Sequence, residues 1–458
     1  MKRFLTYLFT IVVALQMLVS CGEDRTYEYE AKTQHNHWAY DVVLDTYLWA
    51  DSLNDYTPGW KSFFSTPSSF LSTLTSKSKQ NDKWSYVLVD TLQEDAHQRG
   101  YFNHYNSYGF DFVLMTDPTG QSTRSVLRVL TVYPNSPAEQ AGLVRNDFIC
   151  AYGSYGEGSS SAYKISSKNV SRFQKGIARS LEVRHLAQDE TEGVFYWEDT
   201  VTVLLGESRY VEDVPFPVSR IIETDGMKIG YLMCTRLLEG PLEQTLVRSA
   251  SAPYRDQLDG IMAQMQQAHV SEMVLDLRLC NDGTLDMARR LASYVVNPSA
   301  LHTTFAQTIW NKRYETNNLT LPYDASVANL NLSRVYILTS AYTQGAAEWV
   351  IRSLQYSMGE ENVIIIGQKT AGQDVMTQEV GANYHVHLFP VVAYVTDGGG
   401  RHGLGAILPS TEVKEQDAVF LGEYGSPDDI LLYTALANIL GIGQNDTESF
   451  SDSDNSAE

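Results

Sequence analysis

Cysteine is scarce in this chain of 458 residues, which contains only four. The four are Cys21, Cys150, Cys234 and Cys280. The last three stand in apolar, strand-like segments, so we expect buried thiols rather than a disulfide framework. No spacing suggests a metal, because the pairs His35/His37 and His385/His387 each lack a third ligand. The sequence therefore predicts no metal site and no cofactor.

Basic residues are also few. The chain has 34 Lys and Arg against 55 Asp and Glu, giving a formal net charge of -21. So acidic a surface argues against nucleic acid as a partner, and against electrostatic binding to anionic lipid headgroups. With 43% hydrophobic and 19% charged residues, the composition is that of an ordinary globular protein. Its length allows two or three domains.

Only one long apolar run is present, Phe4–Val19, directly after a basic start. This pattern predicts a secretory signal peptide over residues 1–20. Leu18–Cys21 resembles a bacterial lipoprotein box, which implies cleavage before Cys21 and a lipid anchor on that cysteine in the cell envelope. Gly22–Asp24 resembles the acidic stretch that some Bacteroidota lipoproteins carry for export to the surface, so a periplasmic or a surface-facing outer-membrane location stays open. The alternative is an ordinary signal peptide with an incidental cysteine.

The rest of the chain divides by composition. Residues 21–36 are polar and predict a tether, and residues 37–100 are rich in aromatics with helical spacing. Residues 101–210 have the turns and short apolar runs of a β domain, whereas residues 218–442 alternate strands and helices, as α/β domains do. Residues 443–458 are rich in Asp, Ser, Glu and Asn and predict a disordered acidic tail. The sequence therefore predicts a multidomain α+β and α/β protein.

One strand-to-helix turn is the best candidate for a catalytic position. A buried strand at Val335–Leu338 is followed by small residues and an amphipathic helix, an arrangement that often holds a nucleophile and oxyanion-binding N–H groups. Val335–Glu348 resembles the nucleophile segment of the tail-specific (C-terminal processing) serine-lysine peptidases. When the two are aligned on Thr343 and Glu348, the family's catalytic serine falls on Gly345. The resemblance thus implies a peptidase scaffold without its nucleophile.

A second segment bears on the general base. Val363–Gln373 resembles the family's strand and general-base loop, in which Gly367, Thr370 and Gly372 match and the lysine position is Gln373. Glutamine has no titratable nitrogen and cannot deprotonate a serine. We therefore predict that no catalytic dyad is intact.

The oxyanion region is altered as well. The strand and turn from Asp276–Arg278 to Gly283 resemble the family's oxyanion element, with Cys280 in place of an asparagine. The resemblance implies an oxyanion region at Asp282, Gly283 and Ala346. A carboxylate at Asp282, if it points inward, would disfavour a developing negative charge. Asp276 and Arg278 themselves are predicted to form a structural ion pair.

The β domain also carries a resemblance. Val129–Leu143 and Asn146–Cys150 resemble a PDZ domain, which adds a peptide as an extra strand and holds its carboxylate with backbone N–H groups. Tyr108, Gly109 and Phe110 are the candidate carboxylate loop. The alternative is a PDZ fold used only for packing.

The resemblance covers nearly all of the mature chain: a helical N-terminal cap, a PDZ-like β domain and a ClpP/crotonase-like α/β domain. It leaves three functions open. The chain is a pseudo-peptidase that binds peptide or unfolded-protein C-termini, or an active serine endopeptidase with a relocated dyad, or a non-catalytic scaffold lipoprotein. A relocated dyad would use Lys369 with a hydroxyl of Ser340, Tyr342 or Thr343.

Overall fold

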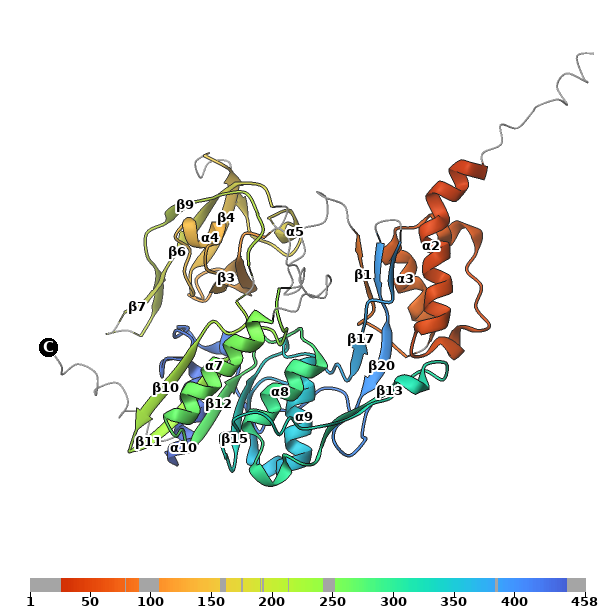
Figure 1. Cartoon of the computed structure of the whole chain (residues 1–458). Coiled ribbons are helices and arrows are strands. Elements are labelled where there is room, and N and C mark those ends of the chain that lie inside the picture. Colours follow the sequence, from red (N-terminus) through yellow and green to blue (C-terminus); the bar gives the residue numbers. More distant parts are fainter. Residues whose placement is uncertain are drawn as a thin grey trace, which may run out of the picture. The chain divides into compact units, whose positions relative to one another are not determined.

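The computed structural model describes residues 26–442 apart from short gaps. The gaps are residues 79, 90–106, 157–161, 174–175, 190, 192, 213, 242–251 and 384–385. The predicted signal peptide, Cys21 and the predicted acidic tail lie outside the described residues. The chain forms two compact units, one from residues 1–90 with 377–392 and the other from residues 91–376 with 393–458 (Figure 1).

The first unit combines helices with a small antiparallel sheet. Its α-helices are α2 (Thr26–Thr46) and α3 (Pro67–Thr75), and its sheet has the order β1 (Tyr86–Val89), β19 (Val386–Phe389), β18 (Gly381–Asn383). The Thr66 hydroxyl caps the N-terminus of α3. The helix begins at Pro67 because proline fits the first helical position.

The predicted tether at residues 21–36 is wrong over its described part, because α2 begins at Thr26. The polar composition of this segment conceals a packed helix. Asn36 is fully buried and donates from its side-chain amide to the carbonyls of Phe63 (3.0 Å) and Ser65 (2.8 Å). Thr33 is also buried, so polar side chains face the interior of this unit.

The helical cap predicted over residues 37–100 contains a strand as well. β1 pairs with β19 from Tyr86↔Phe389 to Val89↔Val386. The apolar stretch at residues 386–393 is divided at Pro390, which has no N–H to donate. β19 precedes this proline and β20 (Val391–Val395) follows it.

In the second unit, residues 107–212 build a β-rich domain around a sheet of order β2-β3-β4-β6-β9, with β5 beside β4. Its elements are β2 (Phe110–Thr116), β3 (Ser125–Val132), α4 (Pro137–Gln140), β4 (Phe148–Ser154), β5 (Tyr163–Lys164), β6 (Arg179–Arg184) and β9 (Val201–Leu205). The stretch from residue 152 to residue 200 contains β6, which pairs with both β4 and β9.

The α/β domain contains a six-stranded sheet of order β10-β11-β12-β15-β16-β21, parallel from β11 onward. The strands are β10 (Ser219–Thr224), β11 (Met227–Met233), β12 (Glu272–Asp276), β15 (Val335–Thr339), β16 (Val363–Gly367) and β21 (Thr411–Glu412). A second sheet has the order β14 (Thr320–Pro322), β13 (Thr304–Trp310), β20, β17 (Val375–Thr377).

Helices cover both faces of the six-stranded sheet. The apolar side chains of α7 (Pro253–Gln267), α8 (Leu285–Val295) and α9 (Ala346–Met358) form one core with Leu275 and Ile337. Those of α10 (Ile430–Leu440) form another core with Tyr336 and Leu338, on the opposite side of the same strands. Among the described residues, no helix combines the length and the apolar character needed to span a bilayer.

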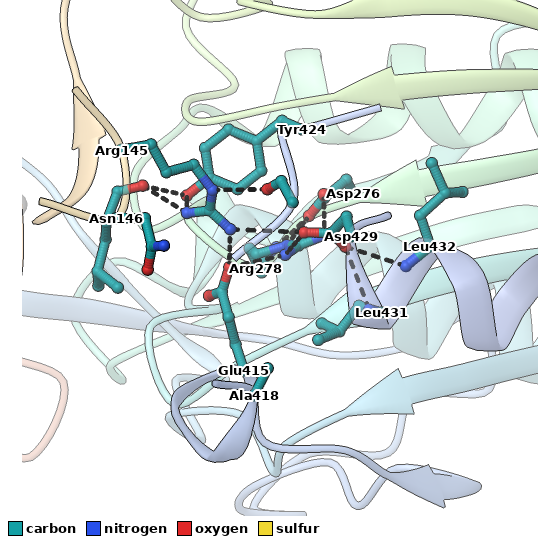
Figure 2. A network of polar contacts seen from close by, with 12 residues as sticks. Arg145, Asn146, Asp276, Arg278, Glu415, Ala418, Tyr424, Asp429, Leu431 and Leu432 are labelled. Carbon is teal, nitrogen blue, oxygen red and sulfur yellow. Dashed lines mark hydrogen bonds and ion pairs between the residues drawn. The ribbon is translucent and has the colours of Figure 1, made fainter. Parts of the chain in front are cut away.

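A buried network of charges follows β12 (Figure 2). Arg278 is fully buried and pairs with Asp276 at 2.7 Å, as predicted, and also with Asp429 at 2.7 Å. Arg145 of the β-rich domain contacts Glu415 of the α/β domain, and its guanidinium lies 3.9 Å from the ring centre of Tyr424. The network thus joins the two domains of the second unit at the end of the strand that leads into the candidate oxyanion turn.

Disulfide bonds are absent from the three described cysteines, which are Cys150, Cys234 and Cys280. Cys234 and Cys280 are fully buried, as predicted, and burial raises the pKa of both. Cys150 is half-buried, and burial raises its pKa to about 11. At neutral pH none of the three is a thiolate, which is the nucleophilic form.

Candidate active site

The predicted nucleophile position is a sharp turn between β15 and α9. Gly345 caps the helix with φ 55° and ψ −113°, a backbone conformation that L side chains rarely adopt. A strained strand-to-helix turn is the geometry that presents a nucleophile in other α/β enzymes. The turn thus has the strained geometry expected for this position, and residue 345 carries no side chain.

Gln373 lies against this turn. A Cβ placed on Gly345 would be 3.2 Å from the Oε1 atom of Gln373, so the predicted nucleophile and base positions are adjacent in space. The Nε2 atom of Gln373 donates to the carbonyl of Val375 at 3.2 Å. The two positions that the resemblance assigns to nucleophile and base thus lie side by side, and neither side chain has a group that could transfer a proton.

Glu348 holds the two segments together. Its buried carboxylate accepts hydrogen bonds from the Thr370 hydroxyl and from the N–H groups of Gly372 (2.7 Å), Gln373 (2.6 Å) and Gly345 (3.2 Å). Burial raises the pKa of Glu348, and these four donors oppose that rise. The Glu348 carboxylate thus fixes the backbone on both sides of the contact between Gly345 and Gln373.

The candidate oxyanion turn lies next to the first residue of α9. A Cβ on Gly283 would be 2.7 Å from the Cβ of Ala346, so only glycine fits there. The N–H of Gly283 does not point to an empty position, because it donates to the Oδ1 atom of Asp282 at 2.8 Å. The other carboxylate oxygen of Asp282 lies 3.2 Å from Nη1 of Arg236. The Gly283 N–H, which the resemblance assigns to an oxyanion, is therefore already hydrogen-bonded to the Asp282 carboxylate.

Residues 228–413 match peptidase family S41. The match covers less than half of the chain, and only this segment is assigned to the family. A solved Bacteroides fragilis NCTC 9343 protein assigned to the S41 proteases is 28% identical, with a TM-score of 0.73 over 89% of this chain and 97% of that one. Because the structural match covers 89% of this chain, it supports the same mixed α and β multidomain fold outside residues 228–413 as well.

The photosystem II D1 C-terminal processing protease is more distant. It is 14% identical, with a TM-score of 0.44 over 84% of this chain and 93% of that one. The chain has no match among the curated proteins. The predicted family is confirmed for the domain at residues 228–413, and the predicted fold class is confirmed as a mixed α and β multidomain protein.

The hydroxyls proposed for a relocated dyad in the S41 domain have structural partners. Ser340 Oγ donates to the carbonyl of Arg278 at 2.5 Å, and Thr343 Oγ1 donates to the carbonyl of Leu277 at 2.8 Å. These bonds fix the turn after β15 to the end of β12. Tyr342 and Lys369 are exposed. This arrangement argues against a relocated dyad.

The candidate carboxylate loop of the β-rich domain is well ordered by local contacts. Tyr108 and Phe110 are buried, and burial raises the pKa of Tyr108 to about 12. Gly109 has φ 77°, and its N–H donates to Ser107 Oγ at 3.0 Å. β2 follows directly and is the end strand of its sheet, so no described strand lies along its outer edge. An edge strand of this kind can accept a peptide as a further strand.

No sequence motif pointed to Arg236 as part of the site. It follows β11 without a recognisable pattern, and only the fold brings it to the turn after β12. Among the described residues, no group of three or more His, Cys, Asp or Glu side chains could hold a metal ion.

The strained turn leads to a stability prediction. We expect Gly345→Ala to lower the free energy of unfolding by about 1–3 kcal/mol, because alanine must adopt a disfavoured backbone conformation. Its Cβ would also approach Gln373 Oε1 to 3.2 Å. Urea unfolding followed by circular dichroism measures the change. Gly260→Ala is the matched control, since a Cβ in the middle of α7 meets no atom within 4 Å and should stabilise the helix. Equal effects of the two variants would contradict the strain at residue 345.

Proposed function

We propose that this protein is a lipid-anchored S41 family member that binds peptide or unfolded-protein C-termini without hydrolysing them. One observation carries the proposal: Gly345 and Gln373 face each other at the positions of nucleophile and base. The surrounding hydrogen bonds of Glu348 keep the backbone of a peptidase site. Catalysis needs both a nucleophile and a base, and loss of one member of such a unit removes nearly all of its rate.

The second candidate is a scaffold lipoprotein that binds no C-terminus, and one contact favours it. The N–H of Gly109, which would face a ligand carboxylate in the PDZ-like interpretation, is engaged by Ser107 Oγ. The position of β2 supports the first candidate, because a peptide can add only to an end strand of a sheet.

A paired binding and cleavage experiment separates these functions. The mature chain beginning at Gly22 is mixed with an unfolded protein and the products are analysed by mass spectrometry, and its affinity is measured for one peptide with a free or an amidated C-terminus. We expect no cleavage, and about tenfold or greater preference for the free carboxylate, equivalent to the loss of one charge-assisted contact. Cleavage would overturn the proposal, and equal affinity for the two peptides would favour the scaffold.

The anchor is tested separately, and its support is the lipoprotein-box resemblance alone. Protein isolated from the membrane fraction of the producing bacterium should begin at Cys21 and carry the added mass of acyl chains. An unmodified cysteine in that fraction would rule the anchor out.

A further inference from the structure

Three aromatic side chains form a patch on the first unit. Trp60 is 63% exposed and Phe64 is 44% exposed, and both belong to the short 3₁₀ helix η2 (Trp60–Phe64). Their ring centres lie 6.1 Å apart, and the ring centre of Phe64 lies 5.3 Å from that of Tyr29 in α2. We call Tyr29, Trp60 and Phe64 the aromatic patch. All seven tryptophans of the chain lie in its described part, and only Trp60 among them is largely exposed.

The aromatic patch has a fixed support. Phe63, which lies between the two exposed rings in η2, is buried, and its ring stacks on that of His37 with 3.8 Å between the ring centres. The buried amide of Asn36 donates to the Phe63 carbonyl at 3.0 Å. These contacts attach the inner side of η2 to α2. Trp60 and Phe64 therefore keep their exposed positions.

The chemistry of the aromatic patch and its neighbours suits the interfacial layer of a bilayer. The amphipathic rings of Trp and Tyr are favoured at the boundary between membrane and water. The Nζ atom of Lys61 lies 5.4 Å from the ring centre of Trp60, and a lysine in this position can reach phosphates while its stem stays against apolar groups. Glu28 and Glu30 are exposed on either side of Tyr29 in the sequence, and their charges oppose deep insertion.

The aromatic patch also lies close to the predicted anchor. α2 begins at Thr26, five residues after Cys21, and Tyr29 belongs to its first turn. Five residues span at most about 18 Å even when fully extended. An acylated Cys21 would therefore hold the start of α2 near the membrane surface. A bilayer is the occupant that the anchor itself would bring to these rings.

We infer that the aromatic patch inserts into the interfacial layer of the membrane and orients the first unit on it. This inference rests on the lipid anchor of the proposed function and adds a second point of attachment, which restricts the tilt of α2. The contact is apolar rather than electrostatic. Because the chain has a formal net charge of -21, anionic lipid should not strengthen it.

The test uses Trp60 as its own reporter. The mature chain from Gly22, with an N-terminal hexahistidine tag, is held on phosphatidylcholine vesicles by a nickel-chelating lipid, so that the natural anchor is not needed. Tryptophan fluorescence is compared between vesicles with ordinary and with brominated acyl chains, because bromine quenches only nearby rings. We expect quenching of the natural chain, and Trp60→Phe should lose most of it. Trp310→Phe removes a tryptophan from the second unit and should leave the quenching unchanged.

A second measurement tests the contribution of the rings to binding. The untagged mature chain is sedimented with phosphatidylcholine vesicles, with and without phosphatidylserine. We expect Trp60→Ser/Phe64→Ser to bind about tenfold more weakly or worse, as the exposure to water of two partly buried rings would give. Tyr163→Ser/Tyr196→Ser is the matched control, because it removes two exposed rings from the second unit and should not change binding. Circular dichroism checks that both variants fold, and Trp60→Phe is the conservative variant if they do not.

The outcomes separate this inference from the proposed function. If Cys21 is acylated but Trp60→Phe and Trp310→Phe lose the same share of quenching, the anchor stands and the inference is overturned. If Trp60 is quenched while Cys21 is unmodified, the aromatic patch is supported and the anchor of the proposed function fails. A dimer that forms without vesicles and is lost in Trp60→Ser/Phe64→Ser would assign the aromatic patch to a second copy of the chain and overturn the inference.

Discussion

Asp429→Asn is expected to lower the free energy of unfolding by about 3–5 kcal/mol, the usual cost of breaking a buried ion pair from one side. Asp429 is buried and its carboxylate accepts two hydrogen bonds from Arg278, at 2.8 and 2.7 Å. It also caps α10 by accepting the N–H groups of Leu431 and Leu432. Asparagine caps helices as well as aspartate does, so this substitution removes the charge and leaves the cap.

The same variant should reveal a pH dependence. Burial alone would raise the pKa of Asp429, but Arg278, the N–H of Leu432 and Arg145 outweigh it and lower the pKa. A carboxyl group whose pKa is lower in the folded state contributes its full stabilisation above the unfolded pKa of about 3.9 and loses it as the pH falls through the folded value. The difference between the natural chain and Asp429→Asn should therefore shrink below about pH 4.

Urea unfolding at pH 7, 5, 4 and 3 measures this difference. Asp428→Asn is the matched control, because Asp428 is the exposed neighbour and bonds only to Ser426 among the described contacts. A decrease in the free energy of unfolding of less than about 1 kcal/mol at pH 7 is what an exposed ion pair gives. Such a result would contradict the stabilisation expected from the buried pair of Asp429 and Arg278.

The second large effect concerns catalysis. We expect Gly345→Ser/Gln373→Lys to cleave an unfolded protein only weakly, and addition of Asp282→Gly to raise the rate by about 10²–10³-fold, the value of one oxyanion donor. In the double variant the Gly283 N–H is still engaged by the Asp282 carboxylate. A lysine at residue 373 would be buried, which lowers its pKa toward that of a base, whereas the nearby carboxylate of Glu348 opposes this.

Mass spectrometry of the products measures this gain, and a serine-reactive fluorophosphonate separately reports the reactivity of the serine introduced in place of Gly345. The natural chain and a Ser340→Ala variant run beside these variants. If the natural chain cleaves and Ser340→Ala or Lys369→Ala abolishes that activity, the dyad is relocated and the proposed function is wrong. If the triple variant is as weak as the double variant, Asp282 does not limit the site.

The strands and the helix around Gly345 and Gln373 could be predicted because each segment has a local pattern with few solutions, whereas the roles of the two residues were implied by the family resemblance. A buried strand followed by small residues and an apolar helix stripe predicts the β15 turn and α9 without any tertiary information. The strand before Gln373 is predicted in the same way. Their adjacency came from the family resemblance, since no local pattern states which two turns meet.

Arg236 and the first turns of α2 could not be predicted for a related reason. Arg236 gains its role from a partner 46 residues later, which local periodicity does not contain. The buried side chains of α2 include Thr33 and Asn36, so the helix lacks the apolar stripe that normally reveals one. β19 shows the same limit, because its pattern indicates a strand but not that its partner is Tyr86–Val89, far earlier in the chain.

The pairing of β1 with β19 also determines when, during synthesis, the first unit can complete its sheet. Ribosomal synthesis delivers α2, α3 and β1 first, while residues 377–392 follow only after most strands of the α/β domain have been made. Until then β1 is an uncovered strand edge, which is prone to pairing with other chains. The first unit therefore begins early but cannot close until residues 377–392 have been made, and any product that stops before Val386 leaves it without the central strand of its sheet.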